Sequence, residues 1–588
     1  SGSSLYGTNS VAGTVNIITD TGGGPVHGDI DLQGGGLGLF RGIARVAGGM
    51  LDNRLSYSAG LAHLNVTDGV DSAEAVRNWS GQGGLTYALT PHLRIGVTEF
   101  AKTGFLQDNV SPGTTATAPT VGIIPAIPLT GAQIRLADAG QPYNPGNATF
   151  VSSLGDPDAG VYSHFADTLL RFEHEVNSRL SYRVAFNFVD SVRNNTNGPG
   201  GPGYQPLFNT TDRYTGRIGT LQARANYLLG SHQIVTAGYE FEQEHYLDLS
   251  TDQNPDPASR AFFRTDASQR SNAAFAQDEI RLLNGKLQVL LSGRFTQASF
   301  DQPRFVNAPS AYAGLQLPSP PAAYTGDAAL AYFLRTTGTK LRAHVGNSFR
   351  LPSLYERFGE GVYDGYASVY GDPRLSPERT VSGDAGVDQY LFHEHLKISA
   401  SYFYAHLQQV IGFLDFPADY LDPYSRYSGY YNTGGGISRG VELSGEFRPT
   451  AKTTVNASYA YTNARDRTSQ YYTGTLVDPL QTARILPHDV KVVALQQLGK
   501  HLDLSMDFED GSSYLYPLYG YPYHLFGYAY QFEGPRQLGL VAGYTLNPTE
   551  RIATRFYVRV SNVLDQNYYE NAFRTPGRWA VAGIRLSF

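Results

Sequence analysis

The chain has 588 residues, no cysteine and a formal net charge of −7, and only 16 % of its residues are charged. Disulfides and thiolate metal sites are therefore excluded, and the lack of a basic block argues against nucleic acid as a partner. Gly (65), Tyr (41) and the aromatic fraction of 12 % are high. This composition favours one wide transmembrane β-barrel, in which each strand has a lipid face and a wet face. Because the net charge repels anions, an anionic ligand would need locally placed Arg or Lys.

The first residues predict a short strand followed by a flexible link. Leu5, Tyr6 and Gly7 precede a turn of small residues, and Val15 and Ile17 then alternate with polar neighbours. Three consecutive glycines at 22–24 follow, and such a run is typical of a flexible connection.

Strands with two different faces are predicted along most of the remaining chain. Apolar and polar residues alternate with a period of two, the pattern of a β-strand. The clearest runs are 180–188, 221–227, 287–295, 396–404, 441–447, 455–461, 502–508 and 580–588. Their apolar faces often end in an aromatic residue, as at Phe188, Tyr227, Phe508 and Phe588. Aromatic girdles of this kind suit a membrane barrel, although strands in general also favour aromatics.

The connections between the strands alternate between short and long. Ten short turns are predicted, at 51–55, 90–93, 176–180, 229–233, 282–287, 334–341, 391–396, 448–455, 498–502 and 546–552. The intervening connections are longer, and the largest spans 104–163. Short turns on one side and long loops on the other are typical of outer-membrane barrels. With both chain ends on the short-turn side, these turns predict an all-β, 22-stranded antiparallel barrel, which is wide enough to need a plug.

Four stretches resemble one known family. Ser1-Gly2-Ser3-Ser4-Leu5-Tyr6-Gly7 through Thr19 is similar to the end of the plug domain of TonB-dependent outer-membrane receptors. The other stretches are Phe349 to Arg357 with Gly371 to Glu378, Asn432 to Leu443, and Asn562 to Tyr569 with Pro576 to Arg578. The resemblance implies a remnant of the plug and a linker at 1–24 and the receptor barrel at 25–588. The terminal strand ending in Phe588 likewise resembles the insertion signal of outer-membrane barrels.

The resemblance also implies a function. Such receptors capture a scarce, bulky nutrient, and a ferric siderophore is expected here, with cobalamin or another nutrient as the alternative. The expected partners are the TonB–ExbB–ExbD energy-transducing complex, the iron-siderophore and outer-membrane lipid, and the chain is expected to be a monomer without a cofactor in the bacterial outer membrane. The segment that binds TonB and most of the plug are not among these residues, so we expect a fragment of a longer product. A passive pore is the alternative if the truncation is natural.

Candidate ligand-binding residues lie in three tyrosine-rich loops. The first has Tyr363, Tyr366 and Tyr370, and the second has Tyr420, Tyr424, Tyr427, Tyr430 and Tyr431 with Arg426 among them. The third runs from Tyr514 and Tyr516 through Tyr519, Tyr521 and Tyr523 to His524, and of these Tyr519 and Tyr521 are the candidates. Aromatic rings with a few polar groups suit a ligand-binding mouth. The competing interpretation is that these rings pack loops or form the outer girdle.

Metal binding and catalysis have weaker signals. Asp415, Asp419 and Asp422 lie close together but match no calcium motif, so a solvated acidic loop is expected. His393 and His395 fall in a predicted turn. No Ser, His or Asp stands in a recognisable nucleophile setting, and no Gly-rich run has the Lys-Ser/Thr ending of a phosphate loop. A non-enzymatic protein is therefore expected, and an outer-membrane protease or lipase is disfavoured.

Overall fold

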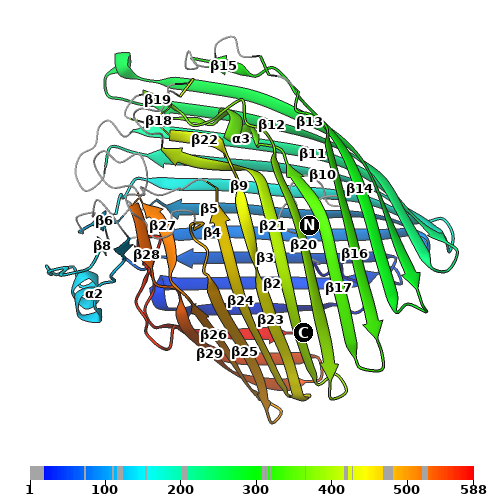
Figure 1. The fold of residues 1–588 in the computed structure, drawn as a ribbon. Helices are drawn as coiled ribbons and strands as arrows, with labels where there is room; N and C mark the ends of the chain where they lie inside the picture. Colours follow the sequence, from blue (N-terminus) through cyan, green and yellow to red (C-terminus); the bar gives the residue numbers. More distant parts are fainter. Residues whose placement is uncertain are drawn as a thin grey trace.

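The computed structural model describes residues 19–71, 75–108, 112–115, 123–152, 155–200, 209–307, 312, 316–317, 319–363, 366–415, 422–424, 426, 428–467, 481–518 and 528–588. Within these residues the chain forms one large antiparallel barrel with long loops at one end (Figure 1). No helix in the described part is long and apolar enough to cross a membrane.

Twenty-two strands follow one another round the barrel. They are β1 (His27–Gly35), β2 (Leu39–Met50), β3 (Leu55–Val66), β4 (Val76–Thr90), β5 (Leu93–Gln107), β9 (Gly160–Glu175), β10 (Leu180–Asn197), β11 (Thr210–Leu229), β12 (Gln233–Asp252), β13 (Phe262–Leu282), β14 (Leu287–Phe300), β16 (Ala323–Leu334), β17 (Thr339–Arg350), β20 (Glu378–Leu391), β21 (Leu396–Asp415), β23 (Gly436–Thr450), β24 (Thr453–Asp466), β25 (His488–Leu498), β26 (Leu502–Gly511), β29 (Arg536–Thr549), β30 (Ile552–Ser561) and β33 (Trp579–Ser587). The 22-stranded prediction is confirmed. Each predicted run lies inside one of these strands, except that 580–588 reaches one residue beyond β33, which ends at Ser587.

The barrel closes between its first and last strands. β1 pairs antiparallel with β33, from Asp29 opposite Ser587 to Gly35 opposite Val581. The backbones of Gly28 and Phe588 exchange two hydrogen bonds of 2.9 and 3.0 Å. The buried Asp29 accepts hydrogen bonds from Arg45, and Arg585 lies 3.3 Å from it. The terminal Phe588 therefore takes part in closing the barrel, which leaves no free sheet edge.

All ten predicted short turns are found, and together they form one end of the barrel. Three of them are tighter than predicted: the breaks fall between Leu334 and Thr339, between Thr450 and Thr453, and between Thr549 and Ile552. The strands reach further because polar residues also fit the wet face of a barrel. Several turns use left-handed backbone, and at Gly338 (φ +65°) a Cβ would lie 2.7 Å from the carbonyl oxygen of Tyr390.

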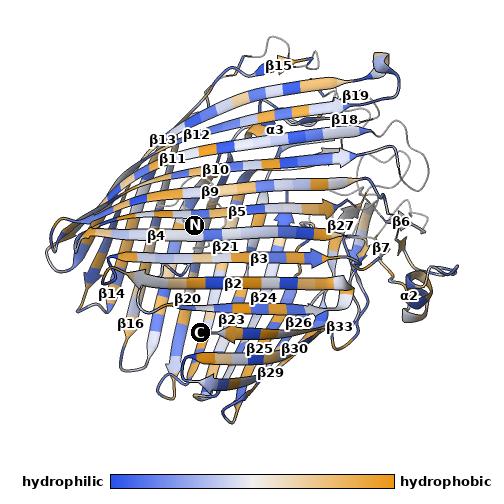
Figure 2. Cartoon of the chain, turned by 180° about the vertical axis from the view of Figure 1, so that it is seen from behind, coloured by the Kyte–Doolittle hydropathy of each residue, from blue (hydrophilic) through white to orange (hydrophobic). Residues whose placement is uncertain are grey.

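The outer face of the strands is apolar and exposed. Leu170, Phe186 and Phe188 remain 48, 42 and 39 % exposed on the outside of β9 and β10. Apolar and polar segments alternate along these strands in Figure 2. A continuous apolar surface of this size is not stable against water and requires a lipid environment.

Charged pairs mark where this lipid-facing surface ends. On the outside of β10 and β11, Asp190 follows Phe188 in the outward register, and Arg217 pairs with it at 2.8 Å. On β13, Arg270 pairs with Asp301 at 2.6 Å. Because charges are costly in the bilayer, β11–β13 extend beyond the membrane on the side of the long loops.

The connections at the long-loop end of the barrel carry short elements of their own, and the first of them forms the whole of the three-residue connection between β1 and β2. These are η1 (Gly36–Gly38), β6 (Gly113–Thr114), β7 (Ile124–Pro125), α2 (Gly131–Asp138), β8 (Phe150–Val151), η3 (Pro257–Ser259), β15 (Arg304–Val306), α3 (Leu354–Phe358), β18 (Glu360–Tyr363), β19 (Tyr366–Val369), β22 (Ser428–Thr433), β27 (Tyr514–Leu518), β28 (Tyr528–Phe532), β31 (Tyr569–Glu570) and β32 (Phe573–Arg574). Two helices, α2 and α3, lie in segments for which the sequence predicted no helix.

The described N-terminal residues run along the barrel wall near the short-turn end. The amide of Gly23 donates to the carbonyl of Gly48, and the amide of Gly49 donates to that of Gly24, both at 2.9 Å. A Cβ on Gly22 would lie 2.1 Å from the carbonyl oxygen of Tyr57, so the close approach requires glycine there. The predicted plug remnant itself lies mostly in residues 1–18, outside the described part.

Candidate ligand-binding mouth

The loop between β17 and β20 packs onto the inner wall of β11–β13. Its helix α3 begins with a capping box, in which Ser353 accepts from the amide of Glu356 and the Glu356 carboxylate accepts from that of Ser353. Leu354 and Phe358 of α3 are each only 1 % exposed and pack with Tyr246 and Ala267 of the wall. Burial of these apolar side chains holds the loop in place.

Behind α3 the loop brings a carboxyl group into a buried polar site. Glu360 is 1 % exposed, and its carboxylate accepts a hydrogen bond from the hydroxyl of Thr265. The backbone amide of Glu360 points to Asp248 at 3.4 Å, and Asp248 also accepts from Tyr246 and Ser250 at 2.9 and 3.0 Å. Burial raises the pKa of Glu360 from 4.5 to about 7, and the Thr265 hydrogen bond only partly opposes this rise. The packed loop therefore favours the protonated acid.

Loop packing should consequently weaken as pH rises. A carboxyl whose pKa is raised on packing stabilises the packed loop fully below pH 4.5. This stabilisation is lost as the pH rises from 4.5 to about 7. The loss corresponds to roughly 3 kcal/mol. We expect hydrogen exchange of peptides covering 354–363 to be faster at pH 8 than at pH 5, after correction for intrinsic exchange. Glu360→Gln should reduce this difference, without abolishing it because Asp248 is buried as well; an unchanged difference in the variant would contradict the assignment to Glu360.

A buried arginine joins this loop to the loop between β21 and β23. The side chain of Arg426 is 1 % exposed and pairs with Asp422 at 3.0 Å and with Asp372 at 3.4 Å. It also donates to the carbonyl oxygens of Tyr370, Gly371 and Tyr430 at 3.1, 3.0 and 2.9 Å. Burial opposes ionisation of Asp422, but the hydrogen bonds from Arg426 hold its pKa below the usual value. We call Arg426 with Asp372 and Asp422 the arginine clasp.

Tyrosines from the first two predicted clusters meet at this clasp. Tyr430 lies 5.1 Å from Phe413 and 6.0 Å from Tyr355, ring centre to ring centre. Tyr370 is next to Phe413 at 6.3 Å, and the backbones of Tyr370 and Tyr430 are hydrogen-bonded at 2.8 Å. The two ring pairs of Tyr430 are edge-on, and such pairs stabilise each other beyond their buried area. The two loops therefore form one aromatic unit.

Of the other predicted residues of these loops, two have described side chains and four do not. Tyr424 is half-buried beside Tyr312 at 5.6 Å, with Arg374 over its ring at 4.8 Å. Tyr431 is half-buried on β22, opposite Gly412. Tyr363 and Tyr366 belong to β18 and β19, but their side chains lie outside the described residues, as do Tyr420 and Tyr427 entirely. Ligand binding by any of these residues stays a prediction.

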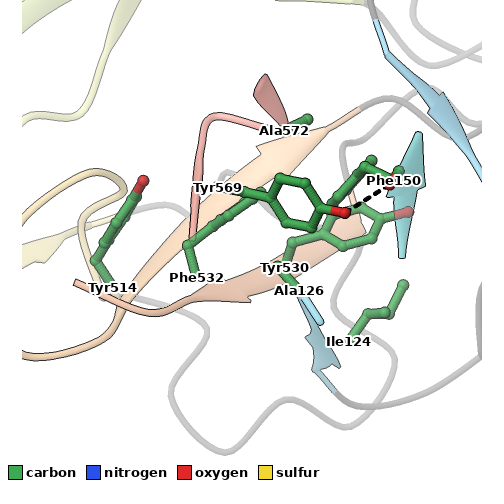
Figure 3. Close-up of a cluster of buried hydrophobic side chains, with 8 residues drawn as sticks. All are labelled: Ile124, Ala126, Phe150, Tyr514, Tyr530, Phe532, Tyr569 and Ala572. Atoms are coloured by element: carbon green, nitrogen blue, oxygen red, sulfur yellow. Dashed lines mark hydrogen bonds between the residues drawn. The ribbon is translucent and has the colours of Figure 1, made fainter. Parts of the chain in front are cut away.

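The third predicted cluster belongs to a separate aromatic core. Tyr514, Tyr530 and Phe532 of the loop between β26 and β29 pack with Phe150 and Tyr569 from two other loops (Figure 3). The hydroxyl of Tyr569 donates to the carbonyl of Phe150 at 2.5 Å. Strand β28 pairs in parallel with β7, with Tyr530 opposite Ile124. Tyr519, Tyr521, Tyr523 and His524 lie outside the described residues.

Several residues of the mouth have no counterpart among the predicted candidates. Tyr214 and Tyr246 come from the wall strands, and Tyr355 from α3 touches Tyr214 at 5.3 Å and Tyr430 at 6.0 Å. The Ser353–Glu356 spacing is a capping-box signal that could have located α3. Nothing in the local sequence marks Tyr214 and Tyr246, because only the barrel register places their side chains inside.

Metal ligands are not gathered in the described part of the chain, where no group of three His, Asp or Glu side chains could hold an ion. Asp422 belongs to the arginine clasp, whereas Asp419 and the side chain of Asp415 fall outside the described residues. His395 caps a turn by a 2.7 Å contact with the carbonyl of Arg448.

Comparison with known proteins decides the family. The model of the family described as TonB dependent receptor-like, beta-barrel, matches residues 126–588. The chain belongs to the TonB-dependent receptors. It is therefore a receptor and transporter of the bacterial outer membrane, and the resemblance seen in the sequence is confirmed. No curated protein sequence matches the chain.

Solved structures agree with this fold. The ferric-catecholate import receptor Fiu from E. coli K12 in its closed form is 14 % identical, with a TM-score of 0.71, covering all of this chain and 85 % of Fiu. The ferripyoverdine receptor of Pseudomonas aeruginosa bound to ferripyoverdine is 13 % identical, with a TM-score of 0.72, covering all of this chain and 75 % of that one. The copper transporter OprC is 14 % identical, with a TM-score of 0.67, covering 97 % of this chain and 82 % of OprC. At these identities the likeness shows the fold alone.

Proposed function

We propose that this receptor takes up a ferric siderophore through the aromatic mouth around the arginine clasp. The observation that carries the proposal is that Tyr370 of the loop between β17 and β20 packs with Phe413 of β21 and Tyr430 of β22 in one aromatic unit. Rings of this kind stack on planar aryl ligands such as catecholates, and tyrosine hydroxyls offer hydrogen bonds at the rim. Two of the structural relatives named above carry iron chelates in their titles.

Transport in this proposal is driven through TonB and its partners ExbB and ExbD. Residues 1–24 form the end of a plug domain and its linker, and 25–588 form the barrel. The described course of Gly22–Gly24 along the barrel wall supports this division. The receptor acts as a monomer without a cofactor, and no chemical step on the ligand is required.

The proposal is tested by equilibrium dialysis of the purified chain in detergent against iron-55 complexes of a catecholate, a hydroxamate and a mixed siderophore. Saturable binding of one complex, and not of free ferric citrate, is the expected result. Preferential binding of cobalamin in the same assay would establish the alternative nutrient instead. Ion conductance in a planar bilayer without saturable binding of any complex would establish a passive pore.

A further inference from the structure

Basic side chains gather on the outer surface of β21, β23 and β24, which lie side by side in the barrel wall (Figure 1). On the lipid-facing side of these strands, Tyr404 of β21 and Leu443 of β23 are 41 and 44 % exposed. Arg439 is directly opposite Tyr404 and lies four residues from Leu443 towards the long loops, so its side chain is on the same outer face. This exposed arginine therefore stands outside the barrel, away from the lumen.

Three more basic residues surround Arg439. Arg465 of β24 is opposite Ile437, and His406 of β21 is opposite the same residue from the other side. Arg467 lies two residues beyond Arg465 and donates a hydrogen bond to Nε2 of His406. Diagonal neighbours in a sheet are about 7–8 Å apart, which is within the reach of long side chains. We call Arg439, Arg465, Arg467 and His406 the outer basic patch.

A row of aromatic rings places this patch at the border of the membrane. Tyr459 and Tyr461 of β24 face outwards like Arg465, and their rings lie 6.1 and 5.1 Å from that of His488. The hydroxyl of Tyr459 is hydrogen-bonded to Nδ1 of His488 at 2.8 Å. Amphipathic rings of this kind collect at the level of the lipid headgroups. Arg465 follows Tyr461 by four residues on the same face, so the patch lies at the headgroups or just beyond them, on the side of the long loops.

Two arginines of the patch, Arg439 and Arg467, form no ion pair with a carboxylate of the described residues. The outward charges on β10, β11 and β13 described above are instead arranged in pairs of opposite sign. Closer to the patch, the outward Asp510 of β26 is paired with Arg536 at 3.0 Å. The chain as a whole carries a net charge of −7, so the local excess of positive charge is opposite in sign to the rest of the molecule. Such a patch attracts anionic groups at the membrane surface.

We propose that the outer basic patch binds the phosphate groups of a lipid in the membrane leaflet on the side of the long loops. Guanidinium groups give phosphate strong, paired hydrogen bonds, and arginines at a membrane surface attract anionic headgroups. The patch is continuous with the apolar outer face of β21, β23 and β24, along which the acyl chains of the same lipid lie. This continuity favours a lipid over a dissolved anion. The site is outside the barrel, so it does not depend on which nutrient the receptor carries.

The test is native mass spectrometry of the full chain, delipidated in an uncharged maltoside detergent. The probes are lipid A carrying two phosphates, the same lipid A without phosphates, and inorganic phosphate. Saturable binding of the phosphorylated lipid A alone is expected. Arg439→Gln and Arg467→Gln should each weaken it about fivefold, because each removes one arginine at the membrane surface. Arg213→Gln makes the same charge change at an exposed position outside β11, so it is the matched control and should leave binding unchanged. Heat-modifiable migration in gels checks that each variant is folded.

A further variant keeps every arginine of the patch. Ile437→Glu places a carboxylate between Arg465 and His406. It should weaken binding of the phosphorylated lipid A at least about tenfold, because the new acid repels phosphate and competes for the arginines. A merely structural role of the arginines does not predict this loss. Equal binding of the two forms of lipid A, binding of inorganic phosphate as tight as that of lipid A, or equal affinities of Arg439→Gln and Arg213→Gln would each overturn the proposal.

Discussion

Replacing Arg426 by glutamine should release the two loops of the mouth from each other. The guanidinium is the shared donor for Asp422, Asp372 and three backbone carbonyls. The side chain of Asp422 is only 2 % exposed, so removal of the guanidinium leaves a buried carboxylate without its ion pair. Breaking a buried pair of this kind costs about 3–5 kcal/mol. Hydrogen exchange of peptides containing Tyr430, whose amide donates to the carbonyl of Tyr370, should accelerate roughly a hundredfold.

Arg374→Gln is the matched control for this experiment. Arg374 pairs with the same Asp372 at 2.8 Å, but its side chain is 51 % exposed. An exposed pair contributes about 1 kcal/mol or less, so exchange at Tyr430 should change little. Equal acceleration in the two variants would mean that the clasp does not hold the loops. Arg426→Gln should also weaken binding of the ferric complex, because the aromatic unit is no longer assembled before the ligand arrives.

Replacing Phe532 by alanine should have an effect of similar size on the second aromatic core. Phe532 is fully buried and packs on Phe150 and Tyr514, with ring centres 5.8 and 5.7 Å away. Truncating a buried phenylalanine costs about 3–5 kcal/mol. The amide of Ala126, which donates to the carbonyl of Gln531, should then exchange much faster, while peptides of the barrel strands keep their protection.

Phe573→Ala serves as the control for Phe532→Ala. Phe573 lies in β32 close to the same loops but is 40 % exposed, and an exposed substitution of this kind costs about 0.5 kcal/mol or less. If Phe532→Ala left the exchange of Ala126 as slow as in Phe573→Ala, the aromatic core would not be what holds the three loops together.

The barrel could be predicted from the sequence because its physics is local. The alternation of apolar and polar residues along a strand indicates its two faces. The short turns, such as 229–233, indicate where the chain reverses between two strands. The strand ends were less predictable: at Thr450 and Thr549 polar residues continue the strand, because the lumen accepts them. α3 was missed because five residues are too few for helical periodicity, although its capping box is present.

The mouth was only partly predictable, because its contacts join residues far apart in the chain. The tyrosine-rich loops could be recognised, but not that Arg426 would be buried among carbonyls of the preceding loop rather than exposed. In the sequence, Tyr246 and Asp248 are indistinguishable from other strand residues. Their role becomes visible only when β12 lies in the barrel wall and α3 packs against it.

We propose that the nutrient binds at the aromatic unit of the arginine clasp. The most direct test of this site is hydrogen exchange of the full chain with and without a saturating ferric siderophore identified by dialysis. We expect protection in peptides covering 366–377 and 428–434, and no change at the short turns, such as 229–233. Protection confined to other loops, with these two segments unchanged, would contradict it.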